Sequence, residues 1–113
     1  SSIQRAVELK AVGASPAYAR SIEQALPGVP VSNGQLVQLK SVGVTGDYIR
    51  SLKGAGFRDL DVATVVKLRA LQIAPSDIAR VRQRTGRLPT IDEMVEIKAL
   101  GVNPDDLGDD GGP

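Results

Sequence analysis

The chain has 113 residues, a formal net charge of +1 and 42% apolar residues, enough for one domain or one short array of repeats. It contains no cysteine and no histidine, which excludes disulfides, thiolate or imidazole metal sites and a histidine general base. No run of about 18 apolar residues occurs, so the sequence predicts no insertion into a membrane.

The charges are unevenly distributed along the chain. Residues 62–91 hold six basic residues against one aspartate, whereas residues 92–113 hold seven acidic residues against one lysine. This layout fits either a partner site or mutual screening of two oppositely charged surfaces.

The strongest pattern is a short sequence that recurs four times, about every thirty residues. Its copies are Val7–Gly13, Val37–Gly43, Val66–Gln72 and Val95–Gly101. A residue that favours helix N-caps precedes every copy at the same distance, namely Ser2, Ser32, Asp61 and Thr90. Each copy is therefore predicted to lie in a helix of about ten residues. Glycine ends the first, second and fourth of these helices, and we expect Gln72, which ends the third, to be strained.

A second helix is predicted after each of the first three. Its start is marked by Ser15-Pro16, Thr45-Gly46 and Ala74-Pro75, where Ala74 lacks a capping side chain. Apolar residues spaced by three and four follow, as in a helix with one buried face: Ala19, Ile22 and Leu26, then Ile49 and Leu52, then Ile78 and Val81. In the fourth copy Asn103-Pro104 is followed only by Leu107 and a polar tail, and we expect this end to be too short and too polar to fold.

These elements predict an all-α fold of tandem helix-turn-helix hairpins, a short α-solenoid or right-handed superhelix with about seven helices. A single repeat domain spans residues 1–107, with repeats at about 2–31, 32–60, 61–89 and a partial repeat at 90–107. Residues 108–113 are predicted to be disordered.

Two sets of residues are candidate contacts for a partner. The first set is a basic position near the end of each first helix: Lys10, Lys40, Arg69 and Lys98. These cations either form a row along one face of the array that binds an acidic partner, which we call the basic ladder, or have only a structural role. In the second case the aliphatic part of each side chain packs on apolar neighbours, and the charge interacts with the negative end of the helix dipole. The second set comprises Tyr18, Arg20, Tyr48 and Arg50, residue types that are enriched in binding hot spots. The tyrosine rings either contact a partner or pack between helices, and Asp77 replaces them in the third copy.

The sequence predicts no enzyme, no cofactor and no metal site. Its serines lie at caps and on helix surfaces, and Asp105, Asp106, Asp109 and Asp110 lack the alternating spacing of a calcium loop.

The unit Leu-Lys-x-Val-Gly-Val-Thr-x-x-Tyr-Ile-Arg-x-Leu-x-x-x-Gly-Phe, from Leu39 to Phe57, resembles a tandem helical repeat of bacterial envelope proteins. Such repeats occur in tails that follow membrane metallopeptidases of the β-lactam-sensor type and in related regulators. The resemblance covers nearly the whole chain but not the peptidase's zinc-binding helix. It implies a non-catalytic interaction or sensing module, periplasmic in location, whose partner is another protein or another part of the parent chain.

A rival interpretation is a cytoplasmic tandem helix–hairpin–helix DNA-binding domain, whose frame Gly13, Ala19 and Ile22 match. In that family a second glycine in the hairpin lets backbone N–H groups come close to a DNA phosphate. Here the position holds Ser15, Thr45, Ala74 and Asn103, which argues against nucleic acid as the partner.

Overall fold

A computed structural model describes residues 15–107, which form six α-helices and one 3-10 turn without any β-strand. The elements are α2 (Pro16–Ala25), α3 (Asn33–Val42), α4 (Gly46–Ala55), α5 (Val62–Ala70), α6 (Pro75–Thr85), α7 (Ile91–Leu100) and η1 (Pro104–Asp106). The helix predicted before Gly13, with Lys10, and the predicted tail 108–113 lie outside the described residues.

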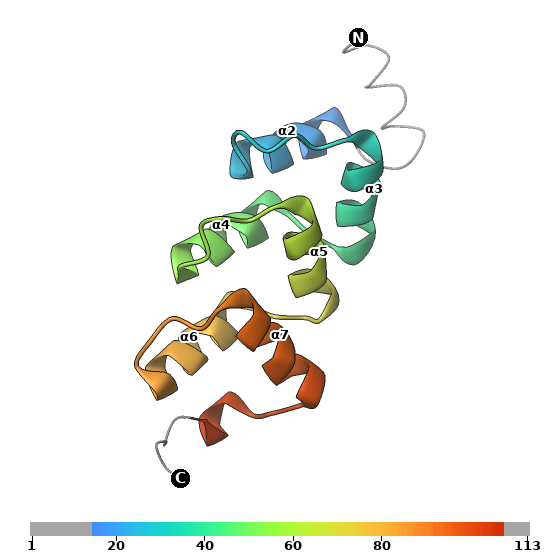
Figure 1. The fold of residues 1–113 in the computed structure, drawn as a ribbon. Helices are drawn as coiled ribbons and strands as arrows, with labels where there is room; N and C mark the ends of the chain where they lie inside the picture. The colour runs from blue at the N-terminus through green and yellow to red at the C-terminus, as the bar shows by residue number, and fades with distance from the viewer. Residues whose placement is uncertain (1–14, 108–113) are drawn as a thin grey trace.

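The helices stack in two layers (Figure 1). Equivalent helices of successive repeats pack on one another, α2 on α4 and α4 on α6 in one layer, and α3 on α5 in the other. The short η1 packs on α6 at the end of the first layer. The molecule measures 58 × 23 × 16 Å, and its radius of gyration of 16.3 Å exceeds the roughly 13 Å of a compact 100-residue domain. The predicted all-α array of stacked hairpins is confirmed.

Side-chain caps begin the helices where the sequence predicts them. Ser15, Ser32, Thr45, Asp61 and Thr90 each accept a hydrogen bond from the backbone N–H three residues later. These bonds satisfy N–H groups that have no partner inside the helix. The caps therefore fix where each hairpin turns.

Both predicted irregularities of the third repeat are present. Gln72 adopts a left-handed backbone with φ of 59°, in the position where α3 and α7 end on glycine. Ala74 supplies no side-chain cap to α6, the Asp77 N–H donates to the Ala74 carbonyl at 2.9 Å, and the Asp77 carboxylate accepts a hydrogen bond from the Ala74 N–H at 2.9 Å. A left-handed conformation costs a residue with a Cβ free energy that glycine does not lose.

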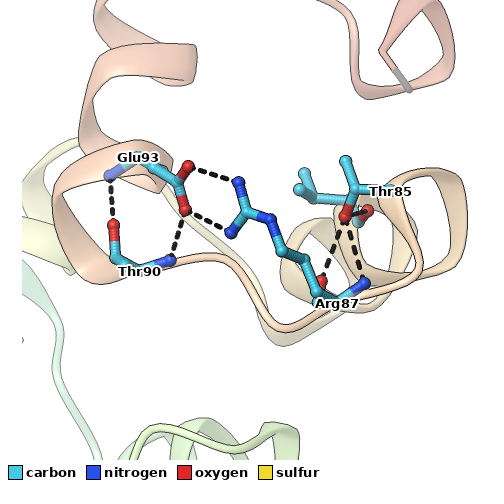
Figure 2. Close-up of polar contacts among 5 residues, drawn as sticks. Thr85, Arg87, Thr90 and Glu93 are labelled. Atoms are coloured by element: carbon cyan, nitrogen blue, oxygen red, sulfur yellow. Dashed lines mark hydrogen bonds and ion pairs between the residues drawn. The ribbon is translucent and has the colours of Figure 1, made fainter. Parts of the chain in front are cut away.

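A network of polar side chains orders the connection between α6 and α7 (Figure 2). The Arg87 guanidinium donates two hydrogen bonds, of 2.9 and 2.7 Å, to the Glu93 carboxylate. Glu93 also accepts from the Thr90 N–H at 2.8 Å, which completes a capping box. The hydrogen bond from Arg87, followed by that from Thr90, lowers the pKa of Glu93 to about 2.

The core is aliphatic and runs the length of the stack. Its fully buried side chains come from both layers: Ile22, Leu36, Leu39, Ile49, Leu52, Val65, Leu68, Ile73, Ile78 and Met94. Phe57, which follows α4, adds one buried aromatic ring. A Cβ at Gly46 would meet the Ser21 backbone oxygen at 3.0 Å, so α4 begins too close to α2 for a larger residue there.

The fourth repeat differs from the expectation that nothing folds after its first helix. Pro104 begins one 3-10 turn, and the Arg84 side chain donates a 3.1 Å hydrogen bond to the Leu107 carbonyl. This turn takes the place at which a second helix would stack on α6.

Candidate functional site: the junctions between repeats

The structure brings the predicted basic ladder and the predicted tyrosines together at the junctions between repeats. Each described cation of the ladder lies against a residue from the second helix of the preceding repeat. We call this set the junction stripe, and its residues are Tyr18, Lys40, Tyr48, Arg69, Asp77 and Lys98.

At the first junction, Tyr18 joins α2 to the turn after α3. Its hydroxyl donates a 2.7 Å hydrogen bond to the Val44 carbonyl, and the Lys40 ammonium lies 5.0 Å from the centre of its ring. A cation at this distance from a ring face is attracted by the ring quadrupole. The Lys40 side chain is exposed, so its charge still faces solvent.

The second junction repeats this arrangement one hairpin later. The Tyr48 hydroxyl donates a 2.6 Å hydrogen bond to the Ile73 carbonyl, and the Arg69 guanidinium lies 5.5 Å from the Tyr48 ring. Buried tyrosines usually find an acceptor for their hydroxyl, and both rings here are half-buried. Burial raises the pKa of Tyr18 and of Tyr48 to about 12, although the Arg69 charge opposes the increase at Tyr48.

The third junction is ionic. Asp77 occupies the tyrosine position, and its carboxylate pairs with Lys98 at 3.5 Å and with Arg80 at 3.1 Å. Burial acts to raise the pKa of Asp77, but the hydrogen bond from Ala74 together with Arg80 and Lys98 keeps it below its usual value. Here the cation of the ladder is neutralised by a carboxylate.

Arg69 has an unusual environment within the stripe. Its Nε is buried and has no hydrogen-bond partner among the described residues, and the side chain lies beside the C-terminus of α3, where a Cβ at Gly43 would be 3.6 Å from the guanidinium. A shallow surface hollow beside it is lined by Val42, Arg69, Ala70 and Gln72. The Arg69 side chain therefore lies near the negative end of the α3 dipole, a position that favours a cation.

Arg20 and Arg50 do not join the stripe. Both are exposed, and Arg50 forms a 2.6 Å ion pair with Asp47 one turn earlier on α4. Two positions along a helix turn a side chain by about 200°, so each arginine lies on the side away from its neighbouring tyrosine. The tyrosines and arginines of the second candidate set therefore form two surfaces, not one.

A second surface, at the end of the stack, was not singled out from the sequence. A hollow of about 320 Å³ lies between α6, α7 and the residues after them. Its apolar lining includes Ile97, Leu100, Val102 and Leu107, and Leu100 is 72% exposed. Comparing the fourth repeat with the buried positions of the other repeats is the signal that could have revealed it.

Within residues 15–107, no cluster of three or more carboxylates is placed to hold a metal ion. In the same residues no helix has the length and apolar character needed to cross a membrane.

Comparison of the chain with protein-family models, curated proteins and solved structures gives no match.

Proposed function

We propose that this chain is a non-catalytic interaction module that binds an acidic segment of another protein, or of its own parent chain, along the junction stripe. The main support is the difference between the cations of the stripe. Lys40 and Arg69 lie over tyrosine rings and have no carboxylate partner among the described residues, whereas Lys98 is paired with Asp77. A ring attracts a cation without cancelling its charge, so two positive charges stay available to a partner.

The regular spacing of the stripe supports a scaffold role. Stacking places equivalent residues of successive repeats along one side of an elongated molecule, as in other repeat proteins that bind extended partners. The polar groups with defined contacts act mainly in caps and junctions, and the sequence offers no histidine or cysteine for a nucleophile–base pair. The exposed Arg20 and Arg50 form a second contact surface in this proposal.

The cellular setting follows from the resemblance of Leu39–Phe57 to repeats in bacterial envelope proteins. On that basis the module belongs to a regulatory membrane protein and acts outside the cytoplasm. The acidic segment would then belong to a neighbouring envelope protein or to the parent chain.

DNA binding is the competing function, and the turns between the helices disfavour it. A helix–hairpin–helix motif offers backbone N–H groups to phosphate. Here the Gly43 and Val44 N–H groups donate to the Lys40 and Leu39 carbonyls, and the Gln72 and Ile73 N–H groups donate in the same way within α5. These hairpin donors are already satisfied inside the protein.

The experiment compares the binding of a fluorescent glutamate-rich peptide, a lysine-rich peptide of the same length and a DNA duplex over a salt series. We expect the glutamate-rich peptide to bind, and the double variant Lys40→Gln/Arg69→Gln to weaken it roughly tenfold, since each exposed ion pair contributes up to about 1 kcal/mol. The matched control is Lys67→Gln/Arg82→Gln, which removes the same charge from exposed positions outside the stripe.

Equal weakening by both double variants would show that the stripe has no special role. Tighter binding to DNA than to the acidic peptide, with a steep loss of affinity as salt rises, would favour the competing function.

A further inference from the structure

The three junctions of the stripe hold their cations in different ways, although these cations share one repeat position. Lys40 and Arg69 lie over tyrosine rings, at 5.0 and 5.5 Å from the ring centres. Lys98 lies 3.5 Å from the carboxylate of Asp77, which takes the place of a tyrosine. A carboxylate neutralises a cation and repels any acidic group that approaches it, whereas a ring leaves the charge of the cation in place.

The Asp77 carboxylate is held in this position through both of its oxygens. Its Oδ2 accepts a 2.9 Å hydrogen bond from the Ala74 N–H and faces the Lys98 ammonium, while its Oδ1 accepts a 3.1 Å hydrogen bond from Arg80. Its side chain is only 13% exposed, and Asp77 is the one buried charged residue in the described part of the chain. With these contacts the carboxylate stays beside Lys98 and does not turn out into solvent.

We propose that Asp77 determines where the junction stripe ends, because it prevents the acidic segment from binding at the third junction. This inference rests on the proposed function, since it concerns how far the same partner reaches along the stripe. The third junction has a cation at the same repeat position as the first two, so the repeat itself would favour binding there as well. A single residue, and not the fold, thus limits the acidic segment to the first two junctions.

The spacing of the first two junctions indicates which acidic segment fits them. The helix that carries Lys40, α3, packs directly on α5, which carries Arg69, and the axes of packed helices lie roughly 8–10 Å apart. A chain in the polyproline II conformation rises about 3.1 Å per residue and has about three residues per turn. Two acidic residues three positions apart in such a chain therefore point the same way and match the two cations.

The experiment titrates the isotope-labelled chain with two peptides at low salt and follows its backbone amide signals by NMR. The two-site peptide has glutamates at two positions three apart, and the three-site peptide adds a third glutamate at the same spacing. The other residues are prolines, which favour the extended conformation. In the parent chain we expect both peptides to shift the signals of the first two junctions only, with affinities within about twofold of each other. Shifts around Lys98 in the parent chain would overturn the proposal.

Asp77→Asn is the main variant, because asparagine keeps an oxygen that can accept from the Ala74 N–H but carries no charge. We expect the signals around Lys98 to shift with the three-site peptide, which should bind about threefold to fivefold more tightly than it binds the parent chain. One further exposed ion pair contributes at most about fivefold. The two-site peptide should gain at most about twofold. An Asp77→Asn chain that keeps its fold without any gain would contradict the proposal.

The matched control is Asp47→Asn. Asp47 forms an ion pair with Arg50 along α4, as Asp77 does with Arg80 along α6, so this variant makes the same change of charge and releases an arginine outside the stripe. It should neither shift the signals of the third junction nor bind the three-site peptide preferentially. An equal gain in Asp47→Asn would mean that the net charge alone sets the affinity.

Two lysine variants assign the effect to Lys98. Asp77→Asn/Lys98→Gln should lose the gain, and a gain that persists would belong to Arg80 and overturn the proposal. In the parent chain Lys98→Gln should change the affinity for either peptide by less than about twofold, whereas Lys40→Gln and Arg69→Gln should each weaken it. This comparison leaves Asp77 in place, so it tests the proposal even if Asp77→Asn does not fold.

The result is separable from the proposed function. If the parent chain binds neither peptide, both the proposed function and this inference fail. If it binds both peptides and loses them in Lys40→Gln/Arg69→Gln, the proposed function stands, and the absence of a gain in Asp77→Asn then overturns this inference alone.

Discussion

The first two junctions of the stack and the third one are held together by different chemistry at the same repeat positions. Tyr18 and Tyr48 reach across to the turn of the next hairpin and donate to the Val44 and Ile73 carbonyls. Asp77 is too short for this reach, and its carboxylate bonds to the start of its own helix and to Lys98.

The difference is linked to the cap at the start of α6. The first two repeats place Ser15 and Thr45 at the N-cap, where each accepts from the backbone N–H of the tyrosine, and the tyrosine side chains take no part in the cap. The third repeat has Ala74 there, and Asp77 binds the Ala74 N–H while it pairs with Lys98. One aspartate thus satisfies the N–H of the N-cap residue and also makes the junction contact, and the third junction lacks the hydrogen bond to the next turn that the tyrosines make.

The largest expected effect contrasts the interior of the stack with its end. Leu39→Ala should lower the free energy of unfolding by about 2–5 kcal/mol, because the side chain is fully buried and its removal leaves a cavity. Ile97→Ala, at the same repeat position, should cost clearly less because Ile97 is half-buried. Urea denaturation followed by far-UV circular dichroism measures both, and equal losses would contradict the lower burial of Ile97.

The next effect concerns the tyrosine junctions. Tyr48→Phe keeps the ring but removes the hydroxyl, which leaves the Ile73 carbonyl without its donor. Losing one partner of a partly buried hydrogen bond costs about 1–3 kcal/mol, and we expect the lower half of this range because the ring is only half-buried. Tyr18→Phe is the matched variant and should behave alike in the same denaturation experiment. A neutral result in both would mean that water replaces the hydroxyl.

The local elements follow from sequence, whereas the junction contacts do not. The caps at Ser32 and Thr90, the left-handed Gln72 and the uncapped Ala74 each depend on neighbouring residues, and all were predicted. The pairing of Lys40 with Tyr18 joins residues of different repeats, and only the way the hairpins stack sets their separation. The sequence therefore supported two interpretations of the ladder and of the tyrosines, without indicating that the two sets meet.

A smaller effect, of opposite sign, is expected at Gln72 next to the second junction. Gln72→Gly removes the left-handed strain but gives the unfolded chain more freedom. A left-handed residue with a Cβ costs about 1–2 kcal/mol, and the extra freedom offsets up to about 1 kcal/mol. We therefore expect Gln72→Gly to raise the free energy of unfolding by roughly 0.5–1 kcal/mol, as measured by urea denaturation. A loss of stability would mean that the exposed Gln72 side chain makes a favourable contact.

The loss of folding stability at high pH should depend on the two tyrosine junctions. The pKa of each tyrosine is raised in the folded chain to about 12 from 10. Because the folded pKa is the higher one, this contribution to stability is complete below pH 10 and is lost as the pH rises towards 12. The chain has only these two tyrosines and no tryptophan, so the absorbance of tyrosinate follows them directly. Titration at pH 10 in the folded protein would contradict the burial of their hydroxyls.

The loss of folding stability at low pH should depend on the third junction instead. The pKa of Asp77 is held below its usual 3.8, so its contribution is present above that pH and is lost as the pH falls below it. Glu93, with a pKa of about 2 in the folded chain against 4.5, loses its contribution over an overlapping range. Denaturation midpoints measured across this range should therefore fall less steeply in Asp77→Asn than in the parent chain, with Glu93→Gln separating the two carboxylates. The Asp77 charge helps to raise the pKa of Tyr48 but not that of Tyr18, so Asp77→Asn should lower the pKa of Tyr48 slightly and leave that of Tyr18 as in the parent chain. A change in the titration of Tyr18 as well would mean that the first and third junctions are coupled through the stack.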